Sequence, residues 1–138
     1  MKIAYADPPY IGQAHRYVEK QEVDHHLLIE RLCAEFPDGW ALSLSSPSLK
    51  QILAMCPDDV RVGAWVKPFA VFKPNVNPAY AWEPVIFRGG RHHRSREEAT
   101  VVQLMGLQVG DEFVDLYLGS GAVTKAWLHF CNQSVMPL

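Results

Sequence analysis

Cysteines and long apolar stretches are both scarce in this sequence. Its three cysteines, at positions 33, 56 and 131, are odd in number and have no Cys-x-x-Cys spacing, which argues against a disulfide framework and against a zinc or redox motif. No segment reaches the roughly 20 consecutive apolar residues that span a bilayer, and the first residues lack the apolar core of a secretion signal. With 138 residues, 49% of them hydrophobic, we expect a single globular domain over residues 1–138, inside the cell and without membrane association.

Positive charge is concentrated in one part of a chain whose net charge is only -2. Residues 60–96 contain seven of the 13 lysines and arginines but one of the 15 acidic residues, so this segment carries +6 and the rest of the chain -8. Such a segment can present a basic face to a polyanion, although a solvated charged loop is equally compatible with the pattern. Because residues 67–84 also combine four prolines with aromatic residues, we expect a proline-rich, basic, substrate-binding segment over residues 67–96.

Apolar patterning predicts strands that alternate with helices. We expect strands at residues 2–6, 40–45, 61–66, 85–87 and 112–118, and helices at residues 24–36, 48–56, 97–107 and 122–130. This order is typical of an α/β domain with a largely parallel sheet. Ligands of such sheets bind beyond the carboxyl ends of the strands, which directs attention to the residues around Asp7 and Gly119.

The tetrad Asp7-Pro8-Pro9-Tyr10 directly follows the first expected strand. The exocyclic amine of adenine is a poor nucleophile, because its lone pair is delocalised into the ring, and two acceptors can pull its nitrogen toward tetrahedral geometry. The carboxylate of Asp7 and the backbone carbonyl of Pro8 can be those acceptors, while Pro9 confines Pro8 to an extended conformation. Tyr10 offers a flat face on which an extruded base can stack. A proline turn that closes the strand explains the prolines but leaves the full tetrad unexplained.

The turn Gly119-Ser120-Gly121 lies between the last expected strand and the last expected helix. Missing side chains allow a ligand to approach the backbone near a helix N-terminus. The turn is an incomplete dinucleotide fingerprint, because Thr124 stands where the third glycine would be, and a tight turn without a ligand is the alternative.

Two of these motifs together resemble a known family. Asp7-Pro-Pro-Tyr10 and Asp115-Leu-Tyr-Leu-Gly-Ser-Gly121 resemble the catalytic and cofactor motifs of S-adenosylmethionine-dependent DNA adenine-N6 methyltransferases. Since the catalytic motif comes first, the chain is most similar to the circularly permuted members, in particular the small bacteriophage DNA methylases, which residues 38–46 and 82–91 also resemble. The resemblance implies a Rossmann-like, three-layer α/β sandwich with a mostly parallel sheet, in the cytoplasm of a bacterial cell or of a phage-infected host.

The resemblance also implies roles for individual residues. Asp7 and the Pro8 carbonyl would hold the adenine amine, with Pro9 shaping the turn and Tyr10 stacked on the flipped base. Other residues would surround the methionine part of S-adenosylmethionine: Asp115, Tyr117, Gly119, Ser120 and Gly121. Contacts to DNA would come from the basic and aromatic residues Lys67, Lys73, Tyr80, Trp82, Arg88, Arg91 and Arg94. No metal is implied, because methyl transfer from a sulfonium needs in-line positioning rather than a Lewis acid.

The cofactor half of the sequence departs from the family pattern. An acidic residue that holds the ribose is expected about 20 residues beyond the glycine turn, but only 17 residues follow Gly121 and residues 116–138 contain no Asp or Glu. We therefore expect a fold that is minimal or truncated at its cofactor-binding end. The alternative function is a non-catalytic remnant or partner subunit that binds nucleic acid with weak or no cofactor binding, and RNA remains an alternative to DNA. A sheet that ends at the strand before the glycine turn leaves an open edge, which predicts a homodimer or a covering tail over residues 133–138.

Overall fold

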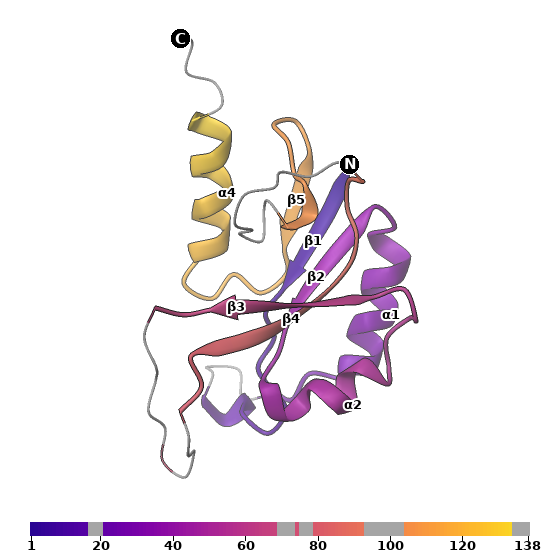
Figure 1. Cartoon of the computed structure of the whole chain (residues 1–138), viewed down its shortest axis with the longest axis vertical. Coiled ribbons are helices and arrows are strands. Elements are labelled where there is room, and N and C mark those ends of the chain that lie inside the picture. The colour runs from indigo at the N-terminus through magenta and orange to yellow at the C-terminus, as the bar shows by residue number, and fades with distance from the viewer. Residues whose placement is uncertain (17–20, 69–73, 75–78, 93–103, 134–138) are drawn as a thin grey trace.

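A single five-stranded sheet organises the protein, and its strands follow the order β3-β4-β2-β1-β5 (Figure 1). The computed structural model describes residues 1–16, 21–68, 74, 79–92 and 104–133. The strands are β1 (Lys2–Ala6), β2 (Gly39–Ser43), β3 (Arg61–Val66), β4 (Trp82–Gly89) and β5 (Glu112–Asp115). The α-helices are α1 (His25–Glu35), α2 (Leu49–Leu53) and α4 (Ala122–Gln133), and two short 3-10 helices span Ala14–Arg16 and Ser46–Ser48.

The sheet is mixed, so the expectation of a mostly parallel sheet is wrong. Strand β1 pairs in parallel with β2 and with β5, whereas β4 runs antiparallel to both β2 and β3. Parallel neighbours need a long crossover, usually a helix, while antiparallel neighbours do not. The segment between β3 and β4 is interrupted by prolines that disfavour a helix, and the chain returns beside β3 in the opposite direction.

Strand β4 begins earlier than the sequence predicts. Trp82, Glu83 and Pro84 belong to this strand and not to the preceding loop. Proline can lie here because the ladder between β2 and β4 ends at the pair Ser43 and Val85, so the missing N–H of Pro84 falls just beyond it. As a result, the side chain of Glu83 is carried by a regular strand.

Several other expected elements are present with small changes at their ends. Helix α1 begins after Asp24, whose Oδ1 accepts a hydrogen bond from the backbone N–H of Leu27 at 3.1 Å, as an N-cap does. Strand β5 ends at Asp115 rather than at Leu118, and α4 continues to Gln133. The helix expected at residues 97–107 lies mostly outside the described residues.

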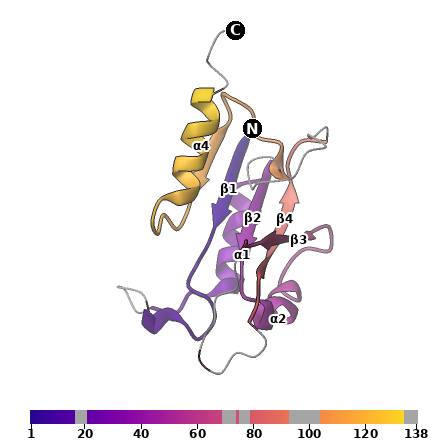
Figure 2. The same ribbon diagram turned by 60° about the vertical axis from the view of Figure 1, so that its left-hand side comes forward.

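Helices cover both faces of the sheet and form three layers (Figures 1 and 2). Because side chains alternate along a strand, Ala4 and Ala6 of β1 join the core cluster that contains residues of α1 and α2. The intervening Ile3 and Tyr5 join a second cluster that contains Trp127 of α4. Within the described residues, no helix is both long and apolar enough to cross a membrane.

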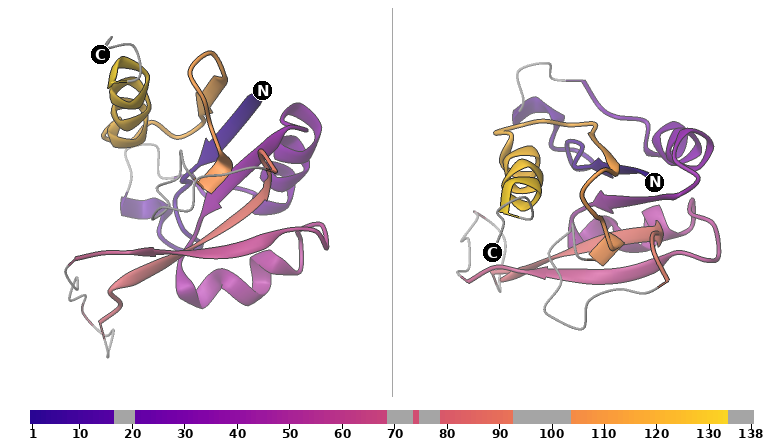
Figure 3. Two further views of the ribbon diagram at one scale, coloured as in Figure 1. Left: turned by 45° about the horizontal axis from the view of Figure 1, so that its top comes forward. Right: turned by 90° about the horizontal axis from the view of Figure 1, so that it is seen from above.

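The two edges of the sheet are β3 and β5 in the part of the chain that the structure describes. The β3–β4 pair continues the sheet on the side of β2 and extends past β1 and β2 (Figures 1 and 3). The position of β5 agrees with the expected edge before the glycine turn. The homodimer stays a prediction, and residues 134–138 of the expected covering tail lie outside the described residues.

Candidate active site

The two motifs meet at one edge of the sheet. Strands β1 and β5 are parallel neighbours with Tyr5 opposite Asp115, and the backbone N–H of Leu116 donates to the carbonyl of Tyr5 at 2.9 Å. The chain therefore leaves both strands at their carboxyl ends, toward Asp7 in one case and toward Gly119 in the other. This is the placement at which open α/β sheets bind ligands.

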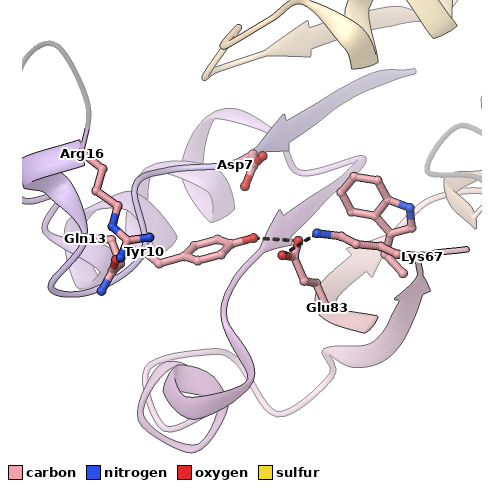
Figure 4. Close-up of a pocket in the computed structure, with 7 residues that line it drawn as sticks. Asp7, Tyr10, Gln13, Arg16, Lys67 and Glu83 are labelled. Carbon is pink, nitrogen blue, oxygen red and sulfur yellow. Dashed lines mark hydrogen bonds and ion pairs between the residues drawn. The ribbon is translucent and has the colours of Figure 1, made fainter. Parts of the chain in front are cut away.

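A cavity of about 350 Å³ opens beyond the carboxyl end of β1 (Figure 4). One wall follows β1, where the backbone N–H of Gln13 donates to the carbonyl of Tyr10 at 2.8 Å and closes a turn before the 3-10 helix Ala14–Arg16. The opposite wall comes from β3, β4 and the residue that follows β3. Its lining residues are Asp7, Tyr10, Gln13, Arg16, Trp65, Lys67 and Glu83.

A carboxylate, an ammonium and a phenol are joined inside this cavity. The hydroxyl of Tyr10 donates to Oε2 of Glu83 at 2.9 Å, and Nζ of Lys67 donates to Oε1 of Glu83 at 2.7 Å (Figure 4). The side chains of Glu83 and Lys67 are only 19% and 21% exposed. Each oxygen of Glu83 thus has its own donor, and the carboxylate links the Asp7–Tyr10 motif to the β3–β4 pair.

Asp7 lies among other negative groups and carries an altered proton affinity. The residue as a whole is exposed to solvent, but desolvation of its carboxyl at the cavity raises its pKa to about 6, followed by the charges of Glu83 and Asp115, with Lys67 acting in the opposite direction. Burial, followed by the charges of Asp7 and Glu83, raises the pKa of Tyr10 well above its usual value. Around neutral pH, Tyr10 is therefore a phenol that donates a hydrogen bond, and Asp7 is largely a carboxylate that accepts them.

The glycine turn connects β5 with α4 and is held by Asp115. Its Oδ1 accepts from the backbone N–H of Tyr117 at 3.2 Å, and its Oδ2 accepts from the hydroxyl of Thr124 at 3.0 Å. Gly119 and Gly121 have φ of 48° and 72°, in the left-handed region that favours glycine. The hydroxyl at position 124 therefore ties the first turn of α4 to the end of β5.

The residues expected at the cofactor turn differ in accessibility. Gly119 and Ser120 are exposed, so their backbone is open to a ligand from outside. Tyr117 is half-buried and packs against the core cluster of α1 and α2. Of the expected cofactor residues, Asp115 lies near enough to Asp7 to raise its pKa, which connects the turn with the cavity.

The expected DNA-contacting residues divide into three groups. Lys67 lines the cavity, and Tyr80 and Trp82 line an adjoining cavity of about 440 Å³ that Tyr10 and Glu83 also border. The rings of Tyr80 and Trp82 meet edge to face with centroids 6.5 Å apart. Two other expected residues, Lys73 and Arg94, lie outside the described residues.

Arg88 and Arg91 form the third group, and the structure does not bring them to the cavity. Arg88 pairs with Asp59, with Nε 2.8 Å from Oδ1. Arg91 binds both carboxylate oxygens of Asp111 at 2.8 and 2.9 Å, near Met1 and therefore at the amino end of β1. Neither residue is among those that line the two cavities, because each has an acidic partner elsewhere in the fold, and their expected contact with DNA stays a prediction.

Four lining residues of the cavity were not expected from the sequence, namely Gln13, Arg16, Trp65 and Glu83. One feature of the sequence could have pointed to Glu83, because it is the only acidic residue among residues 60–96. The other three are ordinary residues of a turn or strand, and only the approach of the β3–β4 pair to the residues after β1 gives them a role.

Comparison with known proteins finds similarity in structure. No protein-family model matches the sequence, and no curated protein has a matching sequence. The crystal structure of M1.HpyAVI, a DNA adenine methyltransferase, superposes with a TM-score of 0.61 at 12% identity, over 95% of this chain and 76% of that chain. This chain therefore shares its overall fold with that methyltransferase. At this identity the similarity concerns the fold alone, and it agrees with the mixed α/β architecture described above.

Proposed function

We propose that the protein is a DNA methyltransferase that transfers a methyl group from S-adenosylmethionine to the N6 amine of a flipped adenine. The observation that carries the proposal is the meeting of Asp7–Tyr10 with the glycine turn at one sheet edge. The similarity to M1.HpyAVI supports it at the level of the fold.

The cavity supplies the acceptors that the amine requires. The carboxylate of Asp7 would accept one amine hydrogen and the carbonyl of Pro8 the other, so that the nitrogen lone pair is directed away from the ring. Tyr10 would stack on the base, with its ring orientation fixed by the bond to Glu83. The N–CH3 bond would form as the S–CH3 bond breaks and its electron pair stays on sulfur, which becomes a neutral thioether. N6 would then lose a proton, and Asp7 is suited to pass that proton to water because its pKa is about 6.

Two features near the glycine turn support its role in binding the expected cofactor. When bound, S-adenosylmethionine supplies an electrophilic methyl group on a sulfonium cation. The exposed backbone of Gly119 and Ser120, just before α4, leaves room for the methionine part of that molecule. The negative charges of Glu83 and Asp115 act on Asp7 and would, together with that carboxylate, stabilise a cation nearby.

The adjoining cavity would accept the nucleotides that flank the flipped adenine. Tyr80 and Trp82 provide faces for stacking, which tolerates any base sequence. Arg16 borders both cavities and would contact a phosphate, together with Lys73 and Arg94.

The direct test is methyl transfer from labelled S-adenosylmethionine to unmethylated DNA of mixed sequence, followed by digestion and identification of N6-methyladenine. Asp7→Ala should lower the rate by at least about 100-fold, since it removes a charged acceptor in the transition state. The control is Asp58→Ala, which removes an exposed carboxylate outside the cavity lining and should keep the wild-type rate.

Two results would overturn the proposal. One is the absence of transfer to duplex or single-stranded DNA, and the other is transfer that Asp7→Ala leaves undiminished. If the protein bound DNA but calorimetry showed no binding of S-adenosylmethionine, the non-catalytic alternative would be favoured instead.

A further inference from the structure

We propose that Glu83 is a positioning residue of this site, which holds the Tyr10 ring in place and presents a negative charge to Asp7. The inference rests on the proposed function, because the reaction gives the positions of Tyr10 and Asp7 their meaning. Glu83 itself acts through these two residues and not on the reacting atoms.

The geometry gives Glu83 a task that a surface ion pair does not have. Its side chain is 19% exposed, and both of its carboxylate oxygens are engaged, by Tyr10 at 2.9 Å and by Lys67 at 2.7 Å. A half-buried ion pair contributes little net stability, because desolvation offsets most of its attraction. The bond to Tyr10 instead connects the catalytic motif with β4 across the cavity (Figure 4).

Among the described residues, few other hydrogen bonds fix Tyr10 in the loop after β1. Pro8 and Pro9 have no backbone N–H, so this part of the loop cannot donate main-chain hydrogen bonds. The carbonyl of Tyr10 accepts from Gln13 at 2.8 Å, which fixes its backbone. The hydroxyl is the polar group of the Tyr10 side chain, and Glu83 accepts its hydrogen bond.

Charge is the second way in which Glu83 acts. The groups that act on Asp7 are Glu83 from β4, Asp115 from β5 and Lys67 after β3, while Arg16 lines the same cavity. After burial, Glu83 contributes most to the raised pKa of Asp7, and Lys67 lowers that pKa. Removing the two charges one at a time should therefore move the titration of Asp7 in opposite directions.

The first experiment follows that titration by the carboxyl carbon signal of Asp7 in NMR. Glu83→Gln should lower the pKa of Asp7, because the negative charge is lost, and Lys67→Met should raise it, because the positive charge is lost. Glu112→Gln is the matched control, since it makes the same change on an exposed residue at the other end of the sheet and should leave the titration unchanged. Unchanged or same-direction shifts in the two cavity variants would contradict the role of charge.

The second experiment measures methyl-transfer kinetics in a double-mutant cycle. Glu83→Ala and Tyr10→Phe should each raise KM for DNA by about tenfold, because each removes a hydrogen bond to a charged group. The double variant should be no worse than either single variant, since both break the same bond. Multiplied effects, or a wild-type KM in Glu83→Ala, would overturn the positioning role.

The pH dependence of the rate completes the test. In Glu83→Gln the acidic limb of the rate profile should move to lower pH, in parallel with the titration of Asp7, whereas a merely structural effect would lower the rate at every pH. Failure of the proposed function is distinguishable from failure of this inference. If the wild-type protein transfers no methyl group, the proposed function fails, whereas an active wild type with an unmoved acidic limb in Glu83→Gln contradicts the inference alone.

Discussion

Arg91 can be tested as a residue of the fold rather than of a DNA-binding surface, by the substitution Arg91→Met. Methionine keeps a long apolar stem and removes the guanidinium. That guanidinium donates to both oxygens of Asp111 at 2.8 and 2.9 Å and to the carbonyl of Gly106 at 3.0 Å. The Asp111 side chain is 5% exposed, so water cannot readily replace the lost donors.

The magnitude follows from these contacts. Hydrogen bonds to a charged group contribute about 1.5–3 kcal/mol each, but Asp111 keeps donors from the Gln108 N–H and the amino terminus, so we expect a loss of about 2–4 kcal/mol. For a chain of this length, 1 kcal/mol corresponds to about 3 °C in Tm, and Arg91→Met should therefore lower Tm by about 6–12 °C.

Thermal unfolding followed by circular dichroism, with DNA affinity measured at two salt concentrations, separates the two roles of Arg91. Arg88→Met is the matched control, because Arg88 pairs with Asp59 at the exposed surface and its loss should leave Tm close to that of the wild type. Equal Tm values for the two variants would refute the reasoning. If Arg91→Met also weakened DNA binding and its salt dependence, Arg91 would belong to the phosphate contacts after all.

The pH dependence of folding stability provides a further check on the pair of Arg91 and Asp111. Burial acts to raise the pKa of Asp111, but hydrogen bonds from Gln108, the amino terminus and Arg91 outweigh it and hold that pKa below its usual value. A lowered pKa in the folded state means stability that is present at neutral pH and is lost as the pH falls through that value. The difference in stability between the wild type and Arg91→Met should narrow at pH below about 4.

Four further outcomes are expected. Methyl transfer should decline as the pH drops through about 6, where Asp7 gains a proton. Because folding raises this pKa, Asp7→Asn should stabilise the protein against urea above pH 6 but not below the ordinary pKa of 3.8. Stabilisation below pH 3.8 but not above pH 6 would contradict the raised pKa of Asp7. Gly89→Ala should cost at least about 2 kcal/mol in urea unfolding, since φ is 70° and the new Cβ would lie 2.5 Å from the carbonyl oxygen of Asp38, so wild-type stability in this variant would show that the turn relaxes. Thr124→Val removes the hydroxyl that binds Asp115 at 3.0 Å and should weaken S-adenosylmethionine binding in calorimetry by about fivefold, whereas unchanged affinity would separate the turn from the cofactor.

Local patterns in the sequence were enough to predict several elements of the fold. Strand β1 ends at prolines, and α1 begins at an N-cap aspartate, so both depend on near neighbours in the chain. The approach of Asp7 to the glycine turn was also predictable, because the carboxyl ends of neighbouring parallel strands lie at the same sheet edge.

The pairing of β4 and the role of Glu83 could not be predicted in the same way. Whether a strand pairs in parallel or antiparallel depends on contacts between distant residues, here the pairing of Trp40 with Arg88 and of Ser43 with Val85. Pro84, two residues after Trp82, favoured a loop, because the sequence does not show that the hydrogen-bond ladder between β2 and β4 ends just before this proline. With residues 67–84 interpreted as a loop, no feature of the sequence predicted that the carboxylate of Glu83 lies beside the hydroxyl of Tyr10.

The pairing of β1 with β5 has a consequence for protein synthesis. Lys2 lies opposite Glu112, so during synthesis β1 is made about 110 residues before β5, the strand that pairs with its second edge. During that interval the nascent chain already contains Asp7–Tyr10 and Glu83 but lacks the glycine turn. A growing chain with an open β1 edge is exposed to association with other chains and to chaperones. The glycine turn of the candidate site is added only when translation has passed Gly121.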